Sequence, residues 1–144
     1  MAIITLSRIV AFWAAQQPDR AAIDHEGIQI SWAELDRRTN RLARAYEKLG
    51  VKQDDFVTIA LPNGIEFFEA CIATWKAGAT PQPISSRLPK HERDQIVELG
   101  KPSLVVGVPA GEYGDTASVP ENFEPDASLP DTELPERMAA SIKA

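Results

Sequence analysis

The spacing of apolar and polar positions predicts a short helix and a hairpin at the start of the chain. Apolar residues recur at helical spacing over 6–17, so we expect a helix that is capped by Ser7 and stops before Pro18. Two short strand-like runs follow, AAID and IQIS, and the letters HEG join them. Because Gly27 can take the positive φ of a tight turn, this pattern predicts an N-terminal β-hairpin.

A longer amphipathic helix is expected over residues 31–50. Ser31 and Glu34 have the spacing of a capping box, which satisfies two free amides reciprocally, and Gly50 is well placed to end the helix. Several arginines lie among acidic neighbours on this helix: Arg37, Arg38, Arg41 and Arg44. Such a face is either solvated or anion-binding, and we favour the solvated interpretation.

Residues 56–107 show the order strand, helix, strand, helix, strand. The β-branched run FVTIAL stops at Pro62. Asn63 and Glu66 then form a second capping-box pattern, which starts a helix that ends at Gly78. The segments TPQPI, LPKHERDQIVELG and SLVVG follow as a strand, a helix and a strand. This order is typical of a parallel sheet with right-handed crossovers.

The fold class expected from these elements is α/β. We predict a partial three-layer lobe, in which a short parallel sheet is flanked by helices, with the N-terminal β-hairpin added. Pro81 and Pro83 have no N–H to donate, so the strand that contains them is a poor central member of the sheet. We assign this lobe to residues 1–107.

Residues 108–144 have a different character from the lobe. They contain five of the chain's eleven prolines and show almost no periodicity. We expect an acidic, proline-rich connection that is either mobile or wraps the surface as a loop. Another strand is expected to start in residues 137–144.

The formal charge of −6 belongs to this second segment. Residues 1–107 carry 13 Lys or Arg against 13 Asp or Glu, whereas residues 108–144 carry 2 against 8. The lobe offers no basic field, so we expect no nucleic-acid binding. No apolar run reaches the ~20 residues that a membrane span needs. A single cysteine excludes an internal disulfide, which fits a cytoplasmic protein.

The sequence contains no local catalytic motif. It has no P-loop, no GxGxxG, no HExxH and no paired cysteines, so we predict no catalytic residue and no metal site. His25 falls in a turn and His91 on a charged helix, and we interpret both as structural. Cys71 borders an apolar helical stripe, where a free cysteine behaves as a small hydrophobe rather than a nucleophile. The tryptophans are expected to be core or packing residues: Trp13, Trp32 and Trp75.

The order of short motifs along the chain is more informative than any one of them. The chain reads Pro18-Asp19, Ser31-Trp32-Ala33-Glu34-Leu35, Asn40-Arg41-Leu42-Ala43, Leu49-Gly50-Val51, Asp55-Phe56-Val57, Leu61-Pro62-Asn63, Glu66-Phe67, Lys76-Ala77-Gly78-Ala79, Pro83 and Arg87-Leu88. This ordered set, over residues 10–107, resembles the N-terminal region of the adenylate-forming (AMP-binding) superfamily. It is most similar to the acyl- and aryl-CoA synthetases.

The resemblance implies a two-step ligase reaction in the parent enzyme. ATP converts a carboxylic acid substrate to an acyl-adenylate, and a thiol, usually coenzyme A, then displaces AMP, while Mg²⁺ neutralises phosphate charge. The family's phosphate loop and catalytic lysine lie further along a chain of family length. We therefore expect an N-terminal fragment of an acyl-CoA synthetase that is inactive alone. ATP, Mg²⁺ and coenzyme A are expected for the intact enzyme.

Two other functions stay open beside this expectation. One is a fragment of an amino-acid-activating adenylation domain, and the other is a stand-alone, non-catalytic α/β interaction module. In an intact enzyme, later strands and helices would cover the apolar surfaces of this lobe. We therefore expect the lobe alone to expose apolar area and to self-associate.

Arg87 is the one candidate binding residue. The resemblance assigns the arginine of an NPRL motif to the phosphates of coenzyme A, and here Ser85-Ser86-Arg87-Leu88 keeps the arginine but not the Asn-Pro. The alternative is an arginine that caps the sheet edge or pairs with Asp94 or Glu92. Asn63 follows a strand on the face where α/β sheets place ligands, but we favour its capping role.

Overall fold

The computed structural model of the chain describes residues 3–138. Its elements in chain order are η1 (Leu6–Arg8), α1 (Ile9–Gln16), β1 (Ala21–His25), β2 (Ile28–Ser31), α2 (Trp32–Lys48), β3 (Phe56–Ile59), α3 (Ile65–Lys76), β4 (Thr80–Pro83), α4 (Lys90–Gly100), β5 (Leu104–Val106) and β6 (Ala117–Val119). Within residues 3–138, no helix is both long and apolar enough to cross a membrane.

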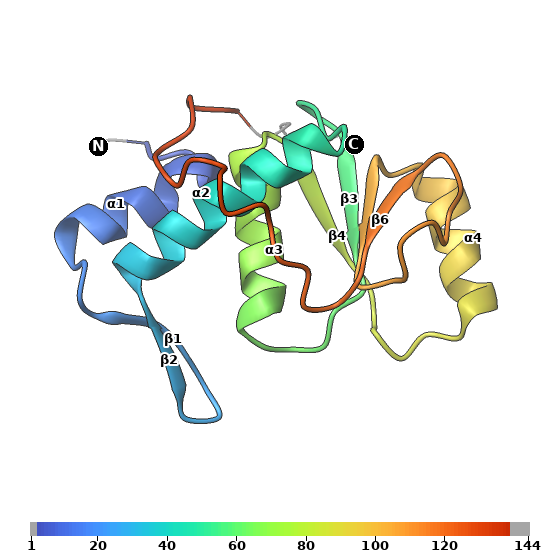
Figure 1. Cartoon of the computed structure of the whole chain (residues 1–144), viewed down its shortest axis with the longest axis horizontal. Coiled ribbons are helices and arrows are strands. Elements are labelled where there is room, and N and C mark those ends of the chain that lie inside the picture. Colours follow the sequence, from blue (N-terminus) through green and yellow to red (C-terminus); the bar gives the residue numbers. More distant parts are fainter. Residues whose placement is uncertain (1–2, 139–144) are drawn as a thin grey trace.

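The central sheet has four parallel strands in the order β4-β3-β5-β6. Alternate residues face opposite sides: Val57, Ile59 and Leu104 pack with α2 and α3, whereas Val105 packs with Val97 of α4. Figure 1 shows α2 and α3 on one side of the sheet and α4 on the other. The predicted three-layer α/β fold is confirmed, and the strand with two prolines lies at the edge, as expected.

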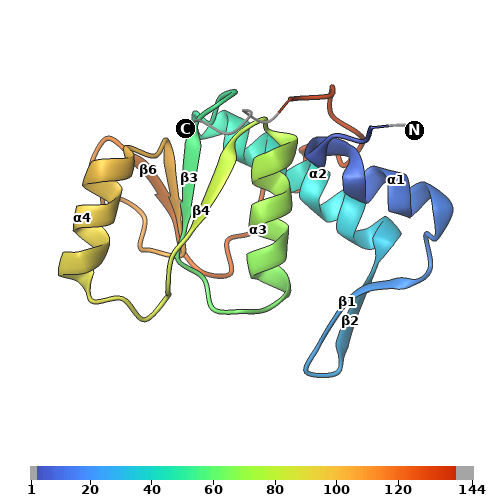
Figure 2. The ribbon, with the colours of Figure 1, turned by 180° about the vertical axis from the view of Figure 1, so that it is seen from behind.

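The predicted N-terminal hairpin is also confirmed. Strands β1 and β2 pair antiparallel, and the turn residues Glu26 and Gly27 have φ values of 54° and 80°. The hairpin extends away from the rest of the molecule (Figures 1 and 2). An apolar cluster of Val10, Ile30 and Ile72 joins it to α1 and α3.

The cap predicted for α2 is confirmed in part. Ser31 Oγ accepts a hydrogen bond of 3.2 Å from the Glu34 N–H, which caps the helix. The Glu34 carboxylate pairs with Arg37 rather than closing the reciprocal box. Gly50 follows the helix with a φ of 107°, which a glycine adopts without strain.

The caps predicted at Ser7 and Asn63 are wrong. Leu6–Arg8 form a 3-10 turn ahead of α1, and the Ser7 hydroxyl lies 3.0 Å from the Thr5 hydroxyl instead of capping. Helix α3 begins directly after Gly64, so Asn63 lies one residue outside the capping position. A shift of one residue takes an Asn side chain away from the amides it would cap.

The segment after β5 adds a strand and then covers α2. Strand β6 was not predicted; it pairs in parallel with β5, with Leu104 opposite Ala117. Residues 120–138, which we call the strap, then run across α2 (Figure 1). Of the two alternatives predicted for residues 108–144, the described part, residues 108–138, is a segment that wraps the surface and includes β6. Of residues 137–144, where another strand was expected, all but the first two lie outside the described residues.

Candidate functional site

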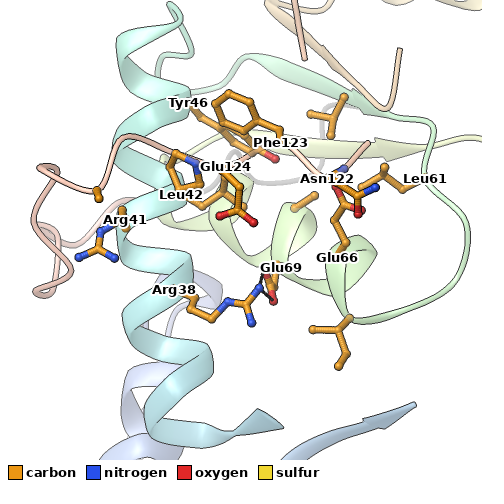
Figure 3. A pocket seen from close by; sticks show the side chains of 15 residues that line it. Arg38, Arg41, Leu42, Tyr46, Leu61, Glu66, Glu69, Asn122, Phe123 and Glu124 are labelled. Carbon is orange, nitrogen blue, oxygen red and sulfur yellow. Dashed lines mark hydrogen bonds and ion pairs between the residues drawn. The ribbon is translucent and has the colours of Figure 1, made fainter. Parts of the chain in front are cut away.

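A cavity of about 380 Å³ opens between α2 and α3. It lies at the carboxyl ends of β3 and β5, where parallel sheets place ligands, and the start of the strap forms its far wall. Figure 3 shows the side chains that point into it. Those labelled there are Arg38, Arg41, Leu42, Tyr46, Leu61, Glu66, Glu69, Asn122, Phe123 and Glu124.

Glu69 and Arg38 form the charged wall of the cavity. Helices α3 and α2 position them opposite each other, and Arg38 Nη2 lies 2.9 Å from Glu69 Oε1 and 3.2 Å from Oε2. Only the contact to Oε2 has the direction of a hydrogen bond, so Oε1 is held by charge alone among the described residues. Burial raises the pKa of Glu69, and the Arg38 charge opposes that rise only in part.

Glu66 fastens the strap to α3. Its Oε1 accepts a hydrogen bond of 2.6 Å from the backbone N–H of Asn122. Burial raises the pKa of Glu66, and the bond from Asn122 works in the opposite direction. Glu66 was expected to complete a helix cap, and its carboxylate joins two segments that are distant in sequence instead.

The other wall of the cavity is apolar. Tyr46 is fully buried, and Leu42 and Phe123 pack in the same core cluster. Burial raises the pKa of the Tyr46 phenol strongly, so it stays protonated at neutral pH. The cavity thus combines one ion-paired wall with one aromatic wall.

This arrangement suits binding rather than bond-making chemistry. No Ser, Thr, Cys, Lys or His lines the cavity to act as a nucleophile. Residues 3–138 contain no group of three or more His, Cys, Asp or Glu placed to hold a metal ion. The described residues therefore form a candidate binding cavity.

Arg87 lies outside this cavity. It is exposed on the loop between β4 and α4, where its backbone N–H donates to Ser85 Oγ at 3.2 Å. Among residues 3–138 its guanidinium forms no ion pair, so the expected alternative pairing with Asp94 or Glu92 is wrong. Asp94 is taken by Lys90, whose Nζ lies 2.7 Å away.

None of the remaining candidates from the sequence lines the cavity. Cys71 is buried, and burial raises the pKa of its thiol to about 11, so it is not an activated nucleophile. Trp32 and Trp75 pack against an apolar cluster, as expected. His91 is exposed on α4, and His25 lies at the tip of the hairpin.

The arginines of α2 have a role that neither alternative described. Arg37 is solvated beside Glu34, but Arg41 Nε donates to the carbonyl of Leu129 at 2.9 Å. Arg44 Nη1 donates to the carbonyls of Pro130 and Thr132. These guanidinium groups hold the strap through its backbone carbonyls. Because every residue has such a carbonyl, the side chains of the strap could not predict these hydrogen bonds.

Lys76 is a second feature that the sequence did not reveal. Its side chain is 4% exposed, and Nζ lies 2.8 Å from Asp36 Oδ1, 2.8 Å from Thr39 Oγ1 and 2.7 Å from Asn40 Oδ1. Burial lowers the pKa of this ammonium, while the bond and charge of Asp36 oppose the change. Lys76 therefore joins the end of α3 to the middle of α2.

The chain has an α/β fold in which a parallel sheet lies between helical layers. The family model described as "AMP-binding enzyme" matches residues 10–140. The chain therefore belongs to the AMP-binding enzyme family and corresponds to the N-terminal region of such enzymes.

Two curated relatives indicate which branches of the family are similar. The chain is 33% identical over 125 residues to a dimodular nonribosomal peptide synthase of Bacillus subtilis, a match that covers 87% of this chain and 5% of the relative. It is 42% identical over 83 residues to 2,3-dihydroxybenzoate-AMP ligase of the same organism. This match covers 58% of this chain and 15% of the ligase. The chain thus spans a small part of these relatives.

Solved structures share the fold at lower identity. The nonribosomal peptide synthetase FmoA3 superposes with a TM-score of 0.82 at 19% identity, covering 94% of this chain and 16% of that one. The N-terminal subdomain of Klebsiella oxytoca NpsA superposes with a TM-score of 0.74 at 17% identity. The match covers 91% of this chain and 35% of that one. A Mycobacterium tuberculosis fatty acyl CoA synthetase superposes with a TM-score of 0.67 at 24% identity. The match covers 71% of this chain and 21% of that one.

Proposed function

We propose that this chain forms the N-terminal lobe of an adenylate-forming enzyme that activates an aryl or amino acid. The observation that carries the proposal is its similarity to a peptide synthase and to an aryl-acid-AMP ligase. These relatives support the amino-acid-activating alternative better than the acyl-CoA synthetase that the sequence motifs favoured. The fatty acyl CoA synthetase shares the fold at 24% identity, which carries no argument about substrate.

In the proposed reaction a carboxylate oxygen of the acid attacks the α-phosphorus of ATP. The bond from that phosphorus to pyrophosphate breaks, and an acyl-adenylate forms. A thiol then attacks the acyl carbon, and AMP leaves with the electron pair of its bond. We place this chemistry in a cytoplasmic protein because Cys71, the single cysteine of the chain, is a buried free thiol.

ATP and Mg²⁺, which the family implies, do not fit the described cavity. Glu66, Glu69 and Glu124 line it against only Arg38 and Arg41, so its charge disfavours phosphate. The absence of a metal-binding cluster within residues 3–138 agrees with this. In the proposal, the groups that bind phosphate and metal belong to other parts of the enzyme.

Arg87 is the residue of this chain that fits a phosphate. It is exposed, and its guanidinium offers a planar set of donors without an ion-pair partner among the described residues. We retain its proposed contact with the phosphates of coenzyme A for the case in which coenzyme A is the acceptor. Arg87→Ala should then raise the KM for coenzyme A by about tenfold and leave adenylation unchanged. Arg37→Ala, at an exposed site on α2, is the control.

The test is ATP–pyrophosphate exchange by a longer polypeptide that carries this chain at its N-terminal end. Aryl acids, amino acids and fatty acids are compared as substrates, followed by transfer to coenzyme A or to a carrier-protein thiol. We expect exchange with an aryl or amino acid and a thioester on the carrier. Exchange with fatty acids alone, with a coenzyme A product, would contradict the proposal. The 144-residue chain by itself should give no exchange with any acid.

A further inference from the structure

The carboxylate of Glu69 has an unused acceptor in the cavity between α2 and α3. Glu69 is 7% exposed, and within residues 3–138 its Oε1 accepts no hydrogen bond, although Arg38 Nη2 lies 2.9 Å away. Buried side-chain oxygens nearly always have a hydrogen-bond donor, because burial removes the water that would otherwise provide one. Glu69 lines the cavity, so a donor that enters the cavity meets this carboxylate.

The cavity carries more acidic than basic groups. Three carboxylates line it: Glu66, Glu69 and Glu124. Of the two arginines in its wall, Arg38 pairs with Glu69, whereas Arg41 is held by the strap. Arg41 Nε donates to the Leu129 carbonyl, and Arg41 Nη2 lies 3.8 Å from Asp131 Oδ2. Burial raises the pKa of Glu69, and the two neighbouring carboxylates raise it further, which indicates a negative field inside the cavity.

The opposite end of the cavity is apolar and aromatic. Figure 3 shows Tyr46 and Phe123 at the end away from the pair of Arg38 and Glu69. Such rings pack against apolar or aromatic groups, and their faces attract a nearby positive charge. The cavity volume of about 380 Å³ falls within the ~300–1,000 Å³ that is usual for small-molecule sites. The cavity therefore has room for a small organic molecule with a charged end and an apolar end.

The acceptors suit an organic cation better than a metal ion. Glu66 Oε1 already accepts from the Asn122 N–H at 2.6 Å, and Glu69 Oε2 accepts from Arg38 at 3.2 Å. A calcium ion needs about six to eight oxygen ligands. Within the described residues, no group of three or more His, Cys, Asp or Glu is placed to hold a metal ion. An ammonium has only three N–H donors, and a few carboxylate oxygens satisfy it.

We propose that this cavity binds a small arylalkylamine in its ammonium form. The ammonium lies at the carboxylates of Glu69, Glu66 and Glu124, and the aromatic body packs against Tyr46 and Phe123. An amine that also carries a carboxylate binds poorly, because its negative charge meets the same acidic side chains. This ligand is thus separate from the acid and the nucleotide of the proposed function.

The test measures binding of phenethylamine to the 144-residue chain by ¹H–¹⁵N NMR at neutral pH and moderate salt. Two analogues isolate the charge. In 2-phenylethanol a hydroxyl replaces the ammonium, and phenylalanine adds a carboxylate to phenethylamine. We expect phenethylamine to bind with a Kd of about 1 mM and both analogues to bind at least about tenfold more weakly. The amide signals of Glu69, Ala70 and Asn122 should shift, and those of α4 should not.

Variants connect the binding to the carboxylates. Glu69→Gln keeps the shape of the side chain but removes its charge, and it should raise the Kd for phenethylamine about tenfold. Glu92→Gln is the matched control, because it removes the same charge from an exposed site on α4 and should leave the Kd unchanged. Glu124→Gln, at an exposed site on the strap, should raise the Kd about threefold. It carries the test if Glu69→Gln does not give a folded circular dichroism spectrum.

Several results would overturn the proposal. Equal binding of 2-phenylethanol would mean that the apolar wall alone selects the ligand, and tighter binding of phenylalanine would mean that the carboxylates do not exclude an acid. Unchanged binding by the variants at Glu69 and Glu124 would place the amine elsewhere. Displacement of phenethylamine by CaCl₂ at equal ionic strength would mean an unselective acidic patch, and no shift at about 20 mM amine would mean no site. ATP–pyrophosphate exchange remains the separate test of the proposed function.

Discussion

The face of α2 under the strap and the apolar groove beside α3 differ in how far the described residues cover them. The groove is a cavity of about 910 Å³ whose lining includes Trp13, Phe68 and Trp75. On α2, Arg41 and Arg44 hold the backbone carbonyls of the strap, and Leu134 adds a buried side chain to the core. Along the groove, Phe68 and its aromatic neighbours have no such cover within the described residues. The chain covers the first face with its own strap, whereas the second face stays partly exposed within the described residues.

The two faces also differ in chemistry. Carbonyl groups occur at every residue, so the arginines can hold a proline-rich segment through its backbone, in addition to side-chain contacts such as that of Leu134. The apolar groove offers only one charged group, Asp24, among the residues that line it. We expect the first face to respond to loss of hydrogen bonds and the second to loss of apolar area.

Removing the ammonium that joins the two helices should have the largest effect. Lys76→Met leaves Asp36, Thr39 and Asn40 without their shared donor in a buried place, and we expect the free energy of unfolding to fall by about 3 kcal/mol. Urea unfolding measures the change. Lys52→Met, at an exposed site, is the matched control and should change stability by less than about 0.5 kcal/mol. Equal effects of the two substitutions would mean that Lys76 does not join α2 to α3.

Loss of the strap contacts should be the next largest effect. Arg44→Ala removes donors to two carbonyls of the strap, and we expect a local loss of about 1–2 kcal/mol. Limited proteolysis should cut residues 129–134 about tenfold faster, with little change in the urea midpoint. Arg37→Ala removes only an exposed pair with Glu34 and should leave the strap resistant. Unchanged proteolysis of the Arg44 variant would show that the hydrogen bonds of Arg44 do not hold the strap.

Features that depend on nearby residues in the sequence could be predicted from the sequence alone. The helix start at Ser31 and the turn at Gly27 depend on neighbours within three residues, so local spacing was sufficient to predict both. The caps at Ser7 and Asn63 failed because each depended on a helix start displaced by one or two residues. Element boundaries of that accuracy are set by tertiary packing.

The candidate site was harder to predict, and the reason is physical. The partners of Lys76 lie on another helix, and the partners of Arg41 are backbone carbonyls that carry no residue identity. Strand β6 is three residues long and has no apolar run to mark it. The family followed from the order of motifs, but the choice between acyl-CoA synthetase and amino- or aryl-acid activation did not.

The cavity should make stability depend on pH through Glu69. Because burial raises its pKa above the ordinary value of 4.5, the folded chain retains a proton that the unfolded chain has lost. Its contribution to stability is thus present below pH 4.5 and is lost as the pH rises through the folded-state pKa. Glu69→Gln should flatten this part of the curve in urea unfolding from pH 4 to pH 7. Glu92→Gln, at an exposed site on α4, controls for the removal of one charge, and a Glu69 variant with the unchanged curve would contradict the assignment.

The smallest effect on stability should come from the residue with the largest effect on association. Phe68→Ser removes apolar area that is already 49% exposed, so the free energy of unfolding should change by less than about 1 kcal/mol. Its self-association, followed by light scattering and by dye binding, should fall clearly below that of the unaltered chain. Leu99→Ser removes an even more exposed apolar side chain from α4, outside the groove, and should leave association unchanged. If the two serine variants reduced association equally, exposed apolar side chains in general would explain the self-association. The groove would then be no different from the rest of the exposed apolar surface.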